Sequence, residues 1–173
     1  MDVLVGYASA HGSTRSIAER IAAVLGDHGL ASRAVPLDSA VDAAGYGAFV
    51  LGSAVHNRTW LVEAKDFVAA NRAVLRTRPV WLFSVGMPAA LRGPWRRFGP
   101  LEERTISAEL RKTVTPRDHV LFSGVFRPEH TSAFGRLLFR AMGSRYGDYR
   151  DWARVTAWAE EIARHLTKEP DTD

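Results

Sequence analysis

Apolar and polar residues alternate along this chain in blocks that predict strands followed by helices. Short apolar, β-favouring runs predict strands at residues 3–7, 32–37, 46–51, 79–85 and 119–125. Apolar residues at helical spacing predict helices that include residues 17–25, 61–68 and 152–166. Strands joined by helical, right-handed crossovers form a doubly wound parallel sheet. We therefore predict an α/β fold with a five-stranded parallel sheet in the order 2-1-3-4-5 and helices on both faces.

Length and composition favour one compact unit. The 173 residues are 46% hydrophobic, which suffices for a single core. We predict one domain over residues 1–168, with insertions at about 89–117 and 126–150 and a disordered tail at 169–173. The first predicted strand leaves no room for a signal peptide, and no apolar run approaches the ~20 residues of a membrane helix. We therefore expect a cytoplasmic protein.

Residue types narrow the chemistry further. The chain has no cysteine, which excludes disulfides, thiol catalysis and cysteine-bound metal centres. We find no catalytic triad, carboxylate pair or metal-ligand cluster in the sequence, and we predict no metal site. The net charge of +4 favours anionic partners without requiring nucleic acid, and we predict no nucleic-acid binding.

A hydroxyl-rich loop between the first strand and the first helix is the strongest functional signal. Residues 3–7 lead into Ser9-Ala10-His11-Gly12-Ser13-Thr14, and helical spacing begins at Ile17. A helix N-terminus binds anions because its first N–H groups lack intrahelical partners and its dipole is positive at that end. The hydroxyls add donors, and glycine lets the backbone curl around an oxygen cluster. The alternative is an ordinary Ser/Thr N-cap, which would not need three hydroxyls.

Other phosphate motifs are absent from this loop. The pattern G-x-x-x-x-G-K-[ST] does not occur, and one glycine stands where the dinucleotide pattern G-x-G-x-x-G needs three. Ala8 and Ser9 occupy the end of the first strand, where a receiver-type site would have acidic residues. A loop that wraps a monophosphate with backbone and hydroxyl donors remains.

Ser9-x-His11-Gly12-Ser13-Thr14 resembles the FMN-phosphate loop of flavodoxins, T/S-x-T-G-x-T, with His11 replacing a threonine. The resemblance implies FMN as cofactor, bound at its phosphate by Ser9, Ala10, His11, Gly12, Ser13 and Thr14. It also implies that the loops after the third and fourth strands hold the flavin ring, through Ser53, Ala54, Val55, His56, Asn57, Trp60, Val85, Gly86 and Met87.

The ring-side loops allow two interpretations of several residues. Gly52 and Gly86 would permit close approach of the flavin, with His56, Trp60 or Met87 supplying a face against the ring. Alternatively, Trp60 fastens the next helix to the sheet, and His56 is a solvated loop residue. Both alternatives stay open at this point.

The remainder of the chain resembles the menaquinone-dependent protoporphyrinogen IX dehydrogenases, FMN enzymes of flavodoxin fold. The similarity lies in a long insertion after the fourth strand, an Arg-rich apolar segment after the fifth, and Asp151-Trp152 opening the last helix. We interpret Asp148 and Asp151 as N-caps. Cations beside an aromatic suit a macrocycle with propionates, so the candidate substrate residues are Arg92, Trp95, Arg96 and Arg97. A solvated basic surface is the alternative.

The combined expectation is an FMN-dependent oxidoreductase, similar to protoporphyrinogen IX dehydrogenase, with a quinone acceptor. The alternatives are a flavodoxin-type electron carrier, an FMN-dependent quinone reductase with another substrate, and a flavin-free binding module. Residues 132–142 alternate apolar side chains with arginines, which allows either peripheral contact with the inner face of an anionic membrane or packing as a short core helix.

Overall fold

The structure, a computed structural model, describes residues 1–37, 41–57, 59–86, 110, 112–127 and 146–168. Its main sheet has the strand order β2-β1-β3-β5-β6, and all four neighbouring pairs are parallel. These strands are β1 (Asp2–Ala8), β2 (Ala31–Pro36), β3 (Ala48–His56), β5 (Val80–Gly86) and β6 (Asp118–Ser123). The predicted order 2-1-3-4-5 is confirmed, because the additional β4 (Thr59–Trp60) pairs only with the end of β3.

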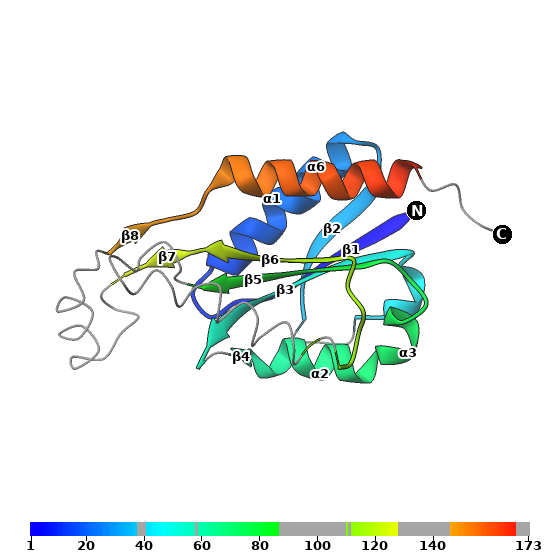
Figure 1. The fold of residues 1–173 in the computed structure, drawn as a ribbon, viewed down its shortest axis with the longest axis horizontal. Helices are drawn as coiled ribbons and strands as arrows, with labels where there is room; N and C mark the ends of the chain where they lie inside the picture. Colours follow the sequence, from blue (N-terminus) through cyan, green and yellow to red (C-terminus); the bar gives the residue numbers. More distant parts are fainter. Residues whose placement is uncertain (38–40, 58, 87–109, 111, 128–145, 169–173) are drawn as a thin grey trace.

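Helices cover both faces of the sheet, as predicted (Figure 1). One face carries α1 (Ser13–Asp27) and α6 (Trp152–Lys168), and the other carries α2 (Val62–Ala70) and α3 (Arg72–Leu75). A short 3-10 turn, η1 (Ala43–Gly45), precedes β3. Successive residues of β3 point to opposite faces of the sheet and belong to separate cores: Val50 packs with α1 and α6, whereas Leu51 packs with α2. Burial on both faces explains why the central strands are apolar throughout.

The carboxyl ends of the parallel strands lie together at one edge, which is the left edge in Figure 1. A small antiparallel ribbon, β7 (Val125–Phe126) with β8 (Gly147–Asp148), extends beyond this edge and leads into α6. The sequence had placed residues 119–125 in one strand. This prediction was wrong at its end, because β6 stops at Ser123 and the chain starts a second pairing after Gly124.

The third strand also differs from its prediction. We expected it to end before Gly52 and Ser53, but β3 continues to His56 and turns into β4. Gly52 does not break the strand, because the Phe83 ring occupies the space beside it: a Cβ at position 52 would lie 2.0 Å from that ring. Asn57 adopts a positive φ of 50°, which closes the β3–β4 hairpin.

The two predicted caps before the last helix have different outcomes. Asp151 caps α6, since its carboxylate accepts a hydrogen bond of 3.0 Å from the Arg154 N–H. Asp148 is not a cap: it lies in β8, and its side chain binds Arg150. The extended backbone of the ribbon explains the error, because it delays the start of the helix.

No helix among the described residues is long and apolar enough to cross a membrane. The predicted substrate segment, the apolar segment at 132–142 and the tail at 169–173 all lie outside the described residues.

Candidate functional site

The loop that follows β1 has the backbone shape of an anion cradle. Gly12 precedes α1 with φ of +88°, a left-handed conformation that favours glycine. Its N–H donates to the Ser9 hydroxyl at 3.0 Å, which fixes the curl of residues 9–12. A Cβ built on Gly12 would meet nothing within 4 Å, so the space beside this glycine is open.

The first turn of α1 has no side-chain cap. Gly12 is the N-cap residue, and no side chain makes a capping hydrogen bond there. The first turn also carries no acidic residue that would balance the helix dipole. The alternative of an ordinary Ser/Thr N-cap is therefore excluded for α1. The unused N–H groups and the dipole favour an anion at this position.

Ser13 connects the loop to the β7–β8 ribbon. Its hydroxyl accepts a hydrogen bond of 3.0 Å from the Val125 N–H, which comes from the β7–β8 ribbon. A hydroxyl that accepts still has its own O–H to donate. Ser13 is half-buried, whereas Thr14 is 1% exposed and faces the core. Ala10 and His11 lie at the exposed tip of the loop.

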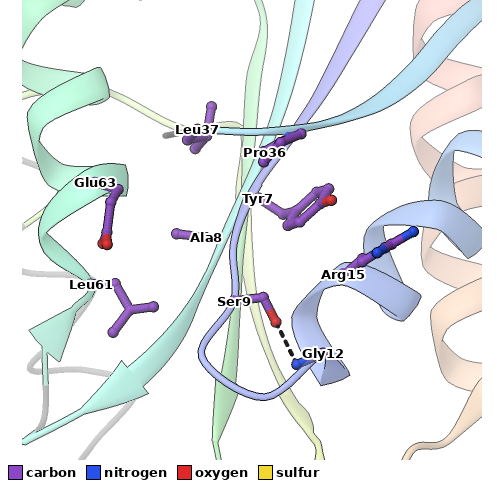
Figure 2. Close-up of a pocket in the computed structure, with 9 residues that line it drawn as sticks. All are labelled: Tyr7, Ala8, Ser9, Gly12, Arg15, Pro36, Leu37, Leu61 and Glu63. Atoms are coloured by element: carbon purple, nitrogen blue, oxygen red, sulfur yellow. Dashed lines mark hydrogen bonds between the residues drawn. The ribbon is translucent and has the colours of Figure 1, made fainter. Parts of the chain in front are cut away.

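A pocket of about 390 Å³ opens beside this loop, between the start of α1 and the start of α2 (Figure 2). Arg15, Ser9 and Gly12 lie on one side, and Leu61 and Glu63 lie on the other. Glu19 forms a 2.7 Å hydrogen bond with Arg15, which raises the pKa of Arg15 above its ordinary value. The complete lining is Tyr7, Ala8, Ser9, Gly12, Arg15, Pro36, Leu37, Leu61 and Glu63.

The β3–β4 hairpin forms the next part of the same sheet edge. Ser53 is fully buried; its hydroxyl donates to the Ala54 carbonyl at 2.8 Å and accepts from the Leu61 N–H at 3.0 Å. Ser53 therefore joins the end of β3 to the start of α2. Ala54 and Val55 are half-buried, and His56 and Asn57 are exposed at the tip.

Trp60 has a packing role under this hairpin. It is 2% exposed, and its indole N–H donates to the Ser84 hydroxyl at 2.8 Å. The Ser84 hydroxyl lies 2.9 Å from His119 Nε2, in a fully buried position. The Ser84 hydroxyl therefore accepts from the Trp60 indole and also forms a hydrogen bond with His119. This chain of contacts corresponds to the packing alternative for Trp60 and fixes the hairpin to β5 and β6.

The structure brings most of the predicted site residues to one edge. Residues 9–14, the β3–β4 hairpin, and Val85 and Gly86 all lie at the carboxyl ends of β1, β3 and β5. Gly86 accepts a hydrogen bond of 3.0 Å from the Gly124 N–H. Met87 and the candidate substrate residues Arg92, Trp95, Arg96 and Arg97 lie outside the described residues.

Sequence reasoning missed several residues near the loop. Tyr7, Arg15 and Glu63 line the pocket, and Arg150, which lies between β8 and α6, contacts the first turn of α1. Arg15 was recognisable as the cation nearest the loop. Arg150 had no signal, because it lies 134 residues from its partner Ser16.

The doubly wound sheet has the order 2-1-3-4-5, and the helix after its first strand begins at a glycine N-cap with no capping side chain. These features are typical of flavodoxin-like α/β proteins. Residues 4–151 match the flavodoxin domain family, and the chain belongs to this family. No curated protein sequence matches the chain.

Solved structures give the same fold at low identity. A flavodoxin mutant from Pseudomonas aeruginosa has a TM-score of 0.62 and 14% identity, covering 96% of this chain and 99% of that one. Oxidised flavodoxin 2 from Bacillus cereus has a TM-score of 0.60 and 20% identity, with 96% and 99% covered. The rubredoxin oxygen:oxidoreductase of Desulfovibrio gigas has a TM-score of 0.61 and 16% identity; 96% of this chain matches 36% of that protein. This chain thus spans about a third of that enzyme's length.

Membership of the flavodoxin domain family implies FMN as the cofactor. The residues present are compatible with its phosphate. The left-handed Gly12 leaves open space, the first turn of α1 has no side-chain cap, and the Ser9 and Ser13 hydroxyls lie beside it. Neutral backbone donors at a helix N-terminus suit a phosphate dianion.

Proposed function

We propose that this protein is an FMN-dependent oxidoreductase that exchanges electrons with small molecules. The observation that carries the proposal is the uncapped start of α1, where Gly12 adopts φ of +88° beside open space. Backbone N–H groups of residues 10–14, with the Ser13 hydroxyl, would hold the phosphate, whereas the predicted Thr14 hydroxyl is left out because that residue is buried and faces the core. Bound FMN would supply the electron transfer.

The ring end of the site would be formed by the β3–β4 hairpin and the end of β5. Ser53 and the contacts from Trp60 to Ser84 hold these segments through buried hydrogen bonds. Buried, satisfied hydrogen bonds make the segments rigid, and rigid segments orient a cofactor with little rearrangement. The half-buried Ala54 and Val55 would contact the flavin, and the exposed His56 and Asn57 would border it.

For the substrate, we propose a quinone as electron acceptor and a porphyrinogen as electron donor. The sequence resemblance to protoporphyrinogen IX dehydrogenases and the net charge of +4 support this choice. A basic protein attracts a propionate-bearing macrocycle or an anionic membrane more strongly than it attracts a basic redox protein. A flavodoxin-type electron carrier is the second candidate, because the family includes proteins of that kind by name.

The test has two stages. Titration of the purified chain with FMN, followed by flavin fluorescence, should show saturable binding; an absence of binding would reject the proposal. The reduced, FMN-loaded protein is then mixed at low salt with a menaquinone analogue or with a cationic cytochrome. Faster reduction of the quinone, with porphyrinogen oxidation under turnover, supports the enzyme. The reverse ranking supports the carrier.

A further inference from the structure

Arg150 is a guanidinium held in place at the start of α1. Its side chain is 21% exposed, and it lies two residues after the end of β8. Nε donates to the Asp148 carboxylate at 2.9 Å, and Nη2 donates to the second oxygen of the same carboxylate. The guanidinium also lies 4.8 Å from the centre of the Trp152 ring. These contacts fix two edges of the group and leave Nη1 to point elsewhere.

Nη1 of Arg150 points at the first turn of α1. It donates to the Ser16 hydroxyl at 2.8 Å, and that hydroxyl donates to the Ser13 carbonyl at 2.8 Å. Ser13 in turn accepts the Val125 N–H. Val125 pairs with Asp148 in the ribbon, so both contacts reach the phosphate loop from one small unit of structure.

The placement of this charge adds to the positive potential at the start of α1, although Asp148 pairs with it from one side. A cation beside a helix N-terminus lies at the positive end of the helix dipole, so the two together attract an anion. The first turn of α1 offers no acidic residue to balance it, and contains Arg15 as well. Asp148 holds the guanidinium from the side away from α1. Its own pKa lies below the ordinary value because of the hydrogen bond with Arg150, so it stays ionised.

We infer that Arg150 is a positioning residue that makes this site selective for phosphorylated flavin over riboflavin. It acts through Ser16 and the first turn of α1, where its charge stabilises a bound phosphate dianion. It is not assigned a contact with the flavin ring. The inference rests on the proposed function, because it requires FMN to bind at the loop.

The experiment compares FMN and riboflavin, which differ only by the phosphate. Each is titrated into the full-length protein as wild type, Arg150→Gln, Ser16→Ala and Arg20→Gln. Arg150→Gln should weaken FMN binding roughly fivefold to tenfold, as expected for loss of a charged partner, and should change riboflavin binding by less than about twofold. The loss should shrink at high salt, which screens the lost charge.

Arg20→Gln is the matched control. Arg20 lies on the same helix and donates to the Thr156 hydroxyl at 3.1 Å, but it lies outside the first turn. This variant should keep the preference for FMN. Ser16→Ala removes the partner of Nη1 while keeping the charge, and should lower the FMN preference in the same direction by a smaller factor. It carries the test if Arg150→Gln does not fold.

The outcomes separate the inference from the proposed function. Wild-type protein that binds neither flavin contradicts the proposed function itself. Wild-type protein that prefers FMN, with the same preference in Arg150→Gln and Ser16→Ala, overturns the role of Arg150 alone. An equal loss of preference in Arg20→Gln would also overturn it, because any charge on α1 would then suffice.

Discussion

The two ends of α1 each have a glycine with positive φ, but the hydrogen bonds around the two glycines differ. Gly12 at the start and Gly29 beyond the end both have positive φ, +88° and +80°, and a Cβ at either position would meet nothing within 4 Å. At the end of the helix, the Gly29 N–H donates to the Gly26 carbonyl, and the Leu30 N–H donates to the Leu25 carbonyl. This is a Schellman motif, which satisfies the helix with its own backbone.

The start of α1 is closed by other elements. The Ser9 hydroxyl accepts the Gly12 N–H, Val125 of the β7–β8 ribbon binds Ser13, and Arg150 binds Ser16. No side chain caps the first turn. The same left-handed glycine conformation therefore has a structural use at one end and a ligand-binding use, in our proposal, at the other. A positive φ alone does not tell these uses apart; the bonding of the neighbouring N–H groups does.

Valine at each glycine gives the largest test of this comparison. Gly12→Val should weaken FMN binding by roughly a hundredfold, since left-handed strain of about 1–3 kcal/mol adds to the loss of space for the phosphate. Gly29→Val should lower the free energy of unfolding by about 1–3 kcal/mol, the left-handed strain alone, and leave FMN affinity unchanged. Fluorescence titration and urea denaturation measure the two effects. Equal FMN affinity in wild type and Gly12→Val would refute the phosphate site.

A buried hydroxyl beneath the hairpin separates stability from phosphate binding. Ser84→Ala leaves the Trp60 N–H and His119 Nε2 without their shared partner, which should lower the free energy of unfolding by about 1–3 kcal/mol. The ratio of FMN to riboflavin affinity should not change, because the start of α1 is intact. Thr167→Ala removes an exposed helix hydroxyl as a control. A Ser84→Ala protein as stable as this control would contradict the structural role of the contact.

Removal of the Ser9 hydroxyl should have a smaller effect. Ser9→Ala loses the hydrogen bond that shapes the loop, so FMN affinity should fall roughly threefold to tenfold, the equivalent of one net hydrogen bond. Ser32→Ala is the control, since it loses a 2.7 Å bond to the Ala22 carbonyl in the later part of α1. FMN titration of both variants checks the difference. A control that weakens FMN as much as Ser9→Ala would show that the loop has no special part in binding.

The smallest effect concerns acid stability. The hydrogen bond from Arg150 lowers the pKa of Asp148 in the folded protein. Ionised Asp148 therefore stabilises the fold above the ordinary carboxyl pKa of about 4, and this contribution is lost as the pH falls through the lower, folded value. The difference in urea midpoint between wild type and Asp148→Asn should narrow as the pH is lowered below about 4. A difference independent of pH would contradict this role of Asp148.

The sequence predicted the fold well where the hydrophobic spacing within a single strand or helix is enough to identify that element. The apolar residues 80–85 form a strand buried on both faces, and Trp158 and Ile162 lie on the buried stripe of α6, as their spacing indicates. The β3–β4 hairpin was missed because its cause lies in another strand. Gly52 and Ser53 are typical loop residues in sequence. In the strand, the Phe83 ring packs against Gly52, and the Ser53 hydroxyl accepts a hydrogen bond from the Leu61 N–H.

The candidate site divides in the same way. The loop at residues 9–14 is local, so its order of strand, glycine and helix was readable, and its shape agrees with that interpretation. The Ser13 contact with Val125 spans 112 residues, and the Arg150 contact with Ser16 spans 134. Such contacts depend on the strand order and on the β7–β8 ribbon, which no local spacing encodes. The flavin contacts of individual residues stay predictions.

The ring of Phe83 fills the space where a side chain at position 52 would lie, so the side-chain volumes at these two positions depend on each other. Phe83 is itself enclosed by Phe122 and Trp158, whose ring centres each lie 6.2 Å from its own. The ring therefore has no room to withdraw if position 52 gains even a methyl group. We expect the two sites to change only together, with a smaller side chain at 83 for any side chain at 52. A glycine that looked like part of a cofactor loop is thus one half of a core packing pair.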